Sequence, residues 1–146
     1  MADESNHLRV RLVTPERTLF ESDATAVELP SKSGYLEVLY GHAPLMAELG
    51  AGDVRVHSGP GIESHSPETE RYNVSWGFVE VLPDRVTILA NDALKPEEID
   101  VARAEQQRQR GEKMWSEAGE SEEAYTEALD VIVEADAKIA SASEKA

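Results

Sequence analysis

Proline and glycine divide this 146-residue chain into two parts that must fold in different ways. All seven prolines and seven of the nine glycines lie within residues 1–96, whereas residues 97–146 contain only Gly111 and Gly119. Because proline and glycine disfavour helix interiors and mark turns, the first part is expected to consist of short elements joined by turns. Long helices are expected only in the second part.

The first part carries the pattern of strands. Apolar and polar residues alternate from Leu8 to Leu12, which indicates a half-buried strand. Turn signals such as Gly50-Ala51-Gly52 and Gly59-Pro60-Gly61 separate most of the later runs, which span residues 17–21, 25–29, 35–39, 45–49, 53–57, 70–75, 78–82 and 85–90. We therefore predict an antiparallel β-sandwich of about 8–10 strands over residues 8–93. A disordered N-terminus, residues 1–7, is expected before it.

The second part is predicted to form an antiparallel two-helix hairpin over residues 97–146, after a linker at residues 94–96. Pro96 suits a first helical turn, so the first helix is expected at 96–114. Ser121 is a suitable N-cap for a second helix at 121–141. The apolar stripe of this second helix has spacings of 3 and 4 and consists of Tyr125, Ala128, Leu129, Ile132, Ala135 and Ile139.

The charge balance excludes several classes of partner. The chain has 14 basic and 29 acidic side chains, a net charge of −15. This surplus repels nucleic-acid backbones and anionic lipid headgroups, so we expect no nucleic-acid binding and no direct lipid insertion. The polar, acidic start MADESNH lacks the features of a signal or transit peptide.

The sequence predicts no metal site and no catalytic site. His7, His42, His57 and His65 have no ligand spacing with carboxylates, and the chain has no cysteine. It also lacks the G-x-S-x-G nucleophile motif and the glycine-rich loops that hold phosphates. We therefore expect a protein that is not an enzyme and that has no required cofactor.

Five segments, in order along the chain, resemble the epsilon subunit of F-type ATP synthases, which is equivalent to the mitochondrial delta subunit. They are Leu8–Glu16, Gly34–Leu45, Gly77–Val81, Arg85–Ala90 and Ile99–Ala104, the last of which matches an [IL]-D-x-x-R-A motif. The most specific match is G-H-A-P-L at residues 41–45. The resemblance covers residues 8–141 and implies a sandwich followed by a helical pair. Glu37, Tyr40 and Trp76 stand where the family usually has glycine, proline and glycine.

The resemblance implies a non-catalytic rotor subunit in proton-driven ATP synthesis. In that family the sandwich binds the gamma subunit and rests on the c ring, and the helical pair reaches the alpha and beta subunits transiently and blocks ATP hydrolysis. It also implies a peripheral location at the cytoplasmic face of a bacterial inner membrane; a bacterium is expected because no presequence precedes residue 8. The residues expected to contact gamma or the c ring are Ser31, Lys32, Ser33, Gly34, Tyr35, Glu37 and His42.

In some members of the family, ATP is a regulatory ligand of the helical pair. The positions that match this motif are Ile99, Asp100, Arg103, Ala104 and Arg110. Arg103 and Arg110 are seven residues apart and therefore share one helix face. Residues 121–146, however, contain no arginine, two lysines and seven acids, so half of the positive charge that phosphate binding uses is missing.

Two alternatives to ATP binding follow from this acidity. In one, Glu127 lies opposite Arg110 and Glu134 opposite Arg103, and the carboxylates hold the hairpin closed in place of phosphates. In the other, the acids form only a solvated face, and Asp100 is simply the carboxylate at a helix start. An acidic second helix also predicts weaker inhibition of hydrolysis than a basic helix gives.

A competing hypothesis is a free-standing β-sandwich that binds a small ligand or a carbohydrate, with the helices as a dimerisation hairpin. It accounts for the order of strands and helices equally well. It does not account for the G-H-A-P-L and I-D-x-x-R-A matches in sequence order, so it ranks second. An enzyme ranks third.

Overall fold

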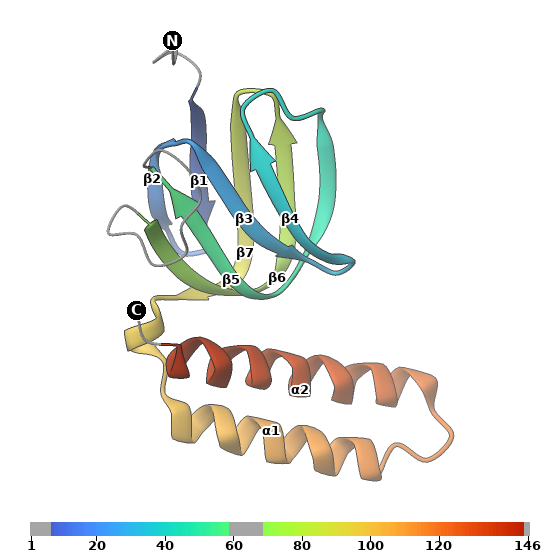
Figure 1. The fold of residues 1–146 in the computed structure, drawn as a ribbon. Coiled ribbons are helices and arrows are strands. Elements are labelled where there is room, and N and C mark those ends of the chain that lie inside the picture. Colours follow the sequence, from blue (N-terminus) through green and yellow to red (C-terminus); the bar gives the residue numbers. More distant parts are fainter. Residues whose placement is uncertain (1–6, 59–68, 145–146) are drawn as a thin grey trace. The chain divides into compact units, whose positions relative to one another are not determined.

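The computed structural model describes residues 7–58 and 69–144, and the chain divides into two units, Met1–Leu94 and Lys95–Ala146 (Figure 1). The strands are β1 (Leu8–Val13), β2 (Thr18–Ala24), β3 (Ala26–Ser31), β4 (Gly34–Leu39), β5 (Leu45–His57), β6 (Thr69–Leu82) and β7 (Arg85–Leu94). The helical elements are the 3₁₀ helix η1 (Pro96–Glu98), α1 (Val101–Ser116) and α2 (Glu122–Ser143). The disorder expected at residues 1–7, apart from His7, and the expected turn Gly59-Pro60-Gly61 lie outside the described residues.

The strands form one continuous sheet in the order β2-β1-β7-β6-β5-β3-β4. Neighbouring strands are antiparallel except β1 and β7, which are parallel. Residues 45–49 of β5 pair with residues 77–81 of β6, whereas residues 51–57 pair with residues 69–75. Figure 1 shows that the long strands β5 and β6 curve strongly, so that one sheet forms both layers of the sandwich, as predicted. The described residues form seven strands because β5 and β6 each join two of the expected runs.

Close packing explains the glycines in the middle of the long strands. The prediction of a turn at Gly50-Ala51-Gly52 is wrong, because these residues lie inside β5. A Cβ atom on Gly50 would lie 2.9 Å from the carbonyl oxygen of Ser31, so glycine allows β3 to approach. In β6, Trp76 and Gly77 both have positive φ, 58° and 129°, which bends the strand.

The sandwich has one hydrophobic core. The alternation expected in β1 is confirmed, since Leu8, Val10 and Leu12 are at most 1% exposed. Further core side chains with exposures of 0% come from β3 to β7: Val27, Leu29, Val38, Leu49, Val54, Val74, Val79, Val81, Val86 and Ile88. Burial of this apolar area supplies the main stabilising free energy of the unit.

The hairpin begins later than the sequence predicts. Residues 96–98 form the 3₁₀ helix η1, and α1 starts only at Val101. The reason is the cap, because the Asp100 side chain accepts a hydrogen bond from Arg103 N at 3.1 Å. The predicted cap of the second helix is confirmed, since the Ser121 hydroxyl accepts from Ala124 N at 3.1 Å.

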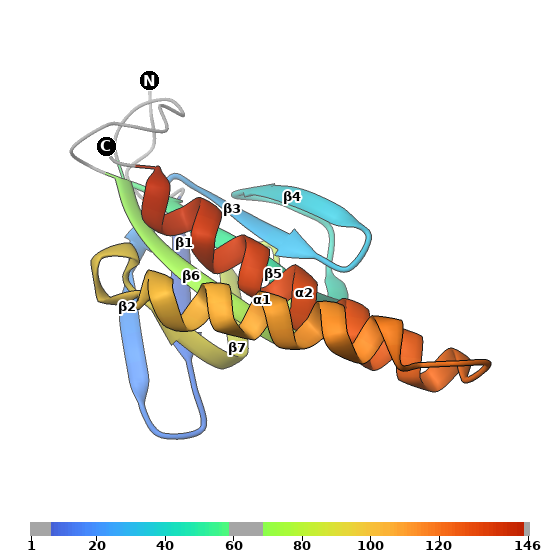
Figure 2. The ribbon, with the colours of Figure 1, turned by 90° about the horizontal axis from the view of Figure 1, so that it is seen from below.

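Small residues bring the two helices together, and α1 and α2 run side by side in Figures 1 and 2. Gly111 is buried, and a Cβ atom there would lie 2.6 Å from Ile132 Cγ1. The buried alanines of α2 include Ala128 and Ala135, at 0% exposure. Leu129 was expected in the buried stripe, but its side chain is 49% exposed. No helix among the described residues has the length and hydropathy to cross a bilayer.

Candidate functional site

An apolar surface, which we call the sandwich patch, lies on the outer face of β5, β6 and β7. It consists of Met46, Phe78 and Leu89, which are 69%, 52% and 49% exposed. Phe78 is paired with Leu89 across β6 and β7, and with Glu48, two residues from Met46, across β5 and β6. Since cross-strand and diagonal neighbours on one face are within reach of each other, the three side chains are adjacent. Contiguous exposed apolar side chains are typical of protein interfaces.

Sequence reasoning missed the sandwich patch, although a signal was present. A strand with one face in the core should alternate between apolar and polar residues, but Phe78-Val79 and Ile88-Leu89 are consecutive apolar pairs. Val79 and Ile88 are fully buried. Because successive side chains point to opposite faces, their neighbours must lie outside. Such pairs in a half-buried strand therefore mark exposed apolar side chains.

The residues expected to contact gamma or the c ring lie along one edge of the sheet, which we call the β4 edge. β4 is the last strand in the sheet order. The turn Ser31–Gly34 leads into β4, Tyr35 and Glu37 lie on it, and His42 follows its end. All of these residues are exposed or half-buried. The fold thus places them in one row about 20 Å long, at roughly 3.3 Å per residue.

The turn before β4 is held firmly against the neighbouring strands. The Ser31 hydroxyl donates to the Gly34 carbonyl oxygen at 2.6 Å. Lys32 N donates to the Glu48 carbonyl oxygen at 3.1 Å, and the Lys32 ammonium lies 3.9 Å from the Glu48 carboxylate. The same ammonium lies 5.6 Å from the centre of the Trp76 ring, in cation–π range. The turn is therefore fixed beside the sandwich patch, because Glu48 is paired with Phe78.

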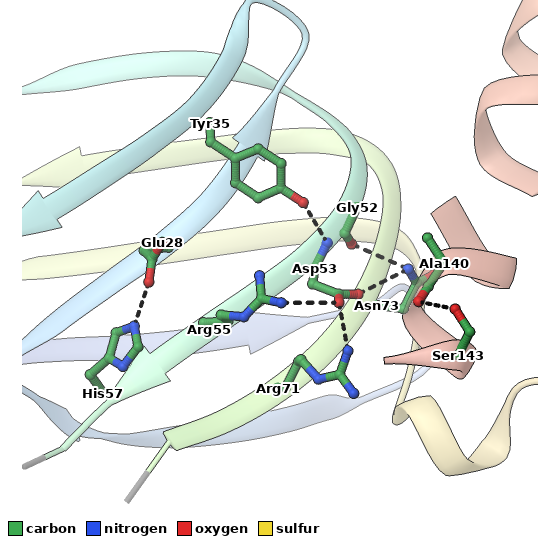
Figure 3. Close-up of polar contacts among 10 residues, drawn as sticks. All are labelled: Glu28, Tyr35, Gly52, Asp53, Arg55, His57, Arg71, Asn73, Ala140 and Ser143. Atoms are coloured by element: carbon green, nitrogen blue, oxygen red, sulfur yellow. Dashed lines mark hydrogen bonds and ion pairs between the residues drawn. The ribbon is translucent and has the colours of Figure 1, made fainter. Parts of the chain in front are cut away.

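A buried polar network connects β4, β5 and β6 (Figure 3). The Asp53 carboxylate lies 2.9 Å from Arg71 Nη1 and 3.8 Å from Arg55 Nη2, and it accepts from Asn73 Nδ2 at 3.2 Å. The three charged side chains are only 8%, 16% and 14% exposed, respectively. Asp53 N also donates to the Tyr35 hydroxyl at 3.0 Å, which anchors the β4 edge to β5.

The buried histidine, His57, lies on the same strand as Asp53 and Arg55. His57 is 1% exposed, with Nε2 at 2.7 Å from Glu28 Oε1 and Nδ1 at 3.0 Å from Thr69 Oγ1. Within residues 7–58 and 69–144, no three histidine, aspartate or glutamate side chains are grouped as metal ligands would be. Both ring nitrogens of His57 are therefore engaged by the strands around them.

Two arginines line a shallow hollow on the hairpin. Arg103, Gln106, Gln107 and Arg110 surround about 360 Å³. In the part of the chain that the structure describes, neither guanidinium group has a hydrogen bond or an ion pair. Two cationic side chains beside amide donors suit an anionic group such as a phosphate.

The other residues of the I-D-x-x-R-A motif have structural positions. Asp100 is the N-cap of α1, and Ile99, 9% exposed, follows η1. Ala104 is 2% exposed and lies seven residues before Gly111, on the same helix face. Of the five residues expected at an ATP site, the structure therefore brings only Arg103 and Arg110 to one hollow.

The carboxylates do not pair with these arginines, so this expectation is wrong. Gly111 packs against Val131 and Ile132, which in an antiparallel pair places Arg110 at the level of residues 132–133 and more than one helical turn from Glu127. Glu134 instead accepts from Lys138 at 3.1 Å and from Gln107 at 3.2 Å. An ion pair between Arg108 Nε and Asp136 Oδ1, at 2.7 Å, joins the two helices.

Comparison with known proteins identifies the family. A family model described as the beta-sandwich domain of the ATP synthase delta/epsilon chain matches residues 7–96. The ATP synthase epsilon chain of Koribacter versatilis is 43% identical over 108 residues, which cover 74% of this chain and 71% of that protein.

Two solved structures share the fold. A chain in the cryo-EM structure of the Euglena gracilis mitochondrial ATP synthase has a TM-score of 0.73 at 18% identity, covering 95% of this chain and 83% of that one. A chain in the Tetrahymena thermophila mitochondrial ATP synthase central stalk and c ring has a TM-score of 0.65 at 14% identity, covering 93% and 96%. The sequence matches favour the subunit hypothesis over a free-standing ligand-binding module. The chain belongs to the delta/epsilon family of ATP synthase subunits.

Proposed function

We propose that this chain is a non-catalytic central-stalk subunit of a proton-driven ATP synthase, and that its sandwich joins the gamma subunit to the c ring. The observation that carries the proposal is the sandwich patch, an exposed apolar surface on a domain that belongs to this family. As part of such a complex the chain would lie at the cytoplasmic face of a bacterial inner membrane without entering the bilayer.

The sandwich patch is the proposed contact with gamma. Exposed apolar side chains are costly in water, and a partner that covers them gains free energy in proportion to the area buried. The rigid sheet beneath, with Val79 and Ile88 in the core, presents the patch without a cost in conformational entropy.

The β4 edge is the proposed contact with the c ring. It is the end of the sheet, and its exposed side chains include Tyr35 and Glu37. An edge strand has backbone groups that no neighbouring strand uses, so a covering partner suits it. The hydrogen bond from Asp53 N to the Tyr35 hydroxyl and the cation–π contact of Lys32 with Trp76 hold this edge against the rest of the sandwich.

The test is the affinity of the full chain for the gamma subunit of the same organism, measured by biolayer interferometry. Phe78 exposes roughly 100 Å², about half of the area of a phenylalanine side chain, which corresponds to at most about 2.5 kcal/mol. Phe78→Ser should therefore weaken binding by tenfold or more, with an upper bound of about 60-fold. Leu89→Ser should act in the same direction.

Leu39→Ser is the matched control, because Leu39 is 48% exposed but lies on β4. It should leave the affinity for gamma within about twofold. Equal affinities for the wild type, Phe78→Ser and Leu89→Ser would refute the gamma contact. Failure of the wild-type chain to bind gamma at all would refute the proposed function.

A second role, the binding of ATP by the hairpin, is favoured by the hollow between Arg103 and Arg110. Its two guanidinium groups would hold phosphate oxygens, while α2 adds no arginine to the site. We infer a weak regulatory nucleotide site, built from α1 alone. Because residues 96–146 carry a net charge of −8, we also propose that the hairpin inhibits ATP hydrolysis less than a basic one would.

Titration calorimetry of ATP into the full chain tests the site. Arg103→Ala with Arg110→Ala should abolish the binding heat. Arg108→Ala should leave it, because Arg108 is already bound to Asp136 and Glu112. No heat with the wild-type chain, or an equal loss in Arg108→Ala, would contradict a site at this hollow. A large rise in hydrolysis by the assembled complex after deletion of residues 97–146 would contradict weak inhibition.

A further inference from the structure

The hairpin has a second surface, on which large apolar side chains are exposed. Trp115, Leu129 and Val133 are 46%, 49% and 38% exposed. A hollow of about 260 Å³ lies among Glu112, Trp115, Leu129 and Ile132, so both helices contribute to it. We call this surface, with its flanking acids, the Trp115 face. It is separate from the hollow that Arg103 and Arg110 line.

The geometry of the Trp115 face is fixed by contacts between the helices. The Trp115 ring stacks edge-on against Tyr125, with centroids 4.6 Å apart. At the other end, Arg108 joins Asp136 at 2.7 Å and Glu112 at 3.1 Å. The alanine and glycine interface keeps α1 and α2 close, so the larger side chains form the walls of an open groove and not the interior of the hairpin. The groove is therefore preformed.

The charge around the groove selects the kind of occupant. Glu112 lines the hollow, and Arg108 is shared between Glu112 and Asp136, so two carboxylates face one guanidinium group. Residues 96–146 as a whole carry a net charge of −8. A second copy of the chain would bring the same negative charge to the contact and would be repelled. A basic partner is attracted instead.

We propose that the Trp115 face binds a basic amphipathic helix of a partner protein. Its apolar side chains, spaced at i, i+3, i+4 and i+7, would fill the hollow over Leu129 and Trp115. Lysines or arginines beside them would pair with Glu112 and Asp136, whose two negative charges share one guanidinium group, that of Arg108. The partner of the hairpin need not be the partner of the sandwich, so the inference goes beyond the proposed function and stands or fails separately from it.

The probe is a synthetic amphipathic peptide of about five helical turns, with leucines on one face and lysines on the others. Binding to the full chain is measured by calorimetry and by the emission of Trp115 in a Trp76→Phe background, since the chain has two tryptophans. We expect a blue shift of the emission and an affinity that falls as salt is added. A scrambled peptide of the same composition controls for non-specific attraction to the acidic chain.

Two variants locate the binding. Leu129→Ser with Val133→Ser keeps every charge and should weaken binding at least tenfold. Met46→Ser with Leu89→Ser, on the sandwich patch, is the matched control and should leave it unchanged. Glu112→Lys should weaken binding of the lysine peptide and strengthen binding of a peptide with glutamate in place of lysine. If circular dichroism shows that the serine variant loses helix, the Glu112→Lys result alone decides whether the peptide binds at the Trp115 face.

Several results would overturn the proposal. They are equal binding of the scrambled peptide, equal binding by the Leu129→Ser, Val133→Ser variant when it is folded, and no effect of Glu112→Lys. A dimer of the wild-type chain in analytical ultracentrifugation that this serine variant abolishes would also overturn it, since a second copy would then be the occupant. Loss of gamma binding by the sandwich would leave all of these results unaffected.

Discussion

Replacing Asp53 with alanine should destabilise the sandwich by about 3 kcal/mol or more. The Asp53 carboxylate is 8% exposed and lies 2.9 Å from Arg71 Nη1 and 3.8 Å from Arg55 Nη2. The substitution removes a counter-charge from the guanidinium groups of Arg55 and Arg71. These groups are only 14% and 16% exposed, so water solvates their charges poorly. For a unit of this size, each kcal/mol corresponds to roughly 4–8 °C, so Tm should fall by about 12 °C or more.

The assay is urea unfolding followed by Trp76 fluorescence in a Trp115→Phe background, because Trp76 is the tryptophan of the sandwich. Asp84→Ala is the control, since Asp84 is 67% exposed and lies 3.7 Å from Arg85; its effect should stay below about 0.5 kcal/mol. Asp53→Leu combined with Arg71→Met should recover part of the loss, since both charges are then absent. If Asp53→Ala is no more destabilising than Asp84→Ala, the network does not hold the strands together as described.

Two further predictions concern glycines. Gly77→Ala should destabilise the sandwich more than Gly34→Ala in the same urea assay: both have positive φ, but a Cβ atom on Gly77 would collide with the Leu89 carbonyl oxygen, whereas Gly34 has open space. Equal losses would show that β6 can shift away from β7 at this point. Gly111→Ala should lower the Tm of the hairpin, measured by far-ultraviolet circular dichroism, despite the higher helix propensity of alanine, because its Cβ would lie 2.6 Å from Ile132 Cγ1. A raised Tm would refute the tight contact between the helices.

Local patterns were sufficient to predict most of the fold. The alternation from Leu8 to Leu12 identified β1 and its buried face, and Ser121 was recognised as the cap of α2. The turn predicted at Gly50-Ala51-Gly52 is absent, because a glycine that permits close packing and a glycine that makes a turn look the same in the sequence. The parallel pairing of β1 with β7 is a long-range contact that no local pattern reports.

The candidate sites were less predictable because they depend on register. The resemblance to the family led to the β4 edge, but not to the sandwich patch, which is visible only once Phe78 and Leu89 are paired. On the hairpin, the prediction that Arg103 and Arg110 share one helix face is confirmed. The prediction that carboxylates of α2 pair with them is wrong. The packing of Gly111 against Ile132 sets the register of the two helices, and no local sequence pattern reports this contact.

Hydroxyl-radical footprinting of the chain, alone and bound to gamma, tests the central claim most directly. Met46 and Phe78 are 69% and 52% exposed in the chain and should therefore be oxidised readily on their own. We predict that gamma protects both several-fold while Tyr35, on the β4 edge, stays reactive until the c ring is added. Equal oxidation of Met46 and Phe78 in the free chain and in the gamma complex would contradict the assignment of the sandwich patch to the rotor interface.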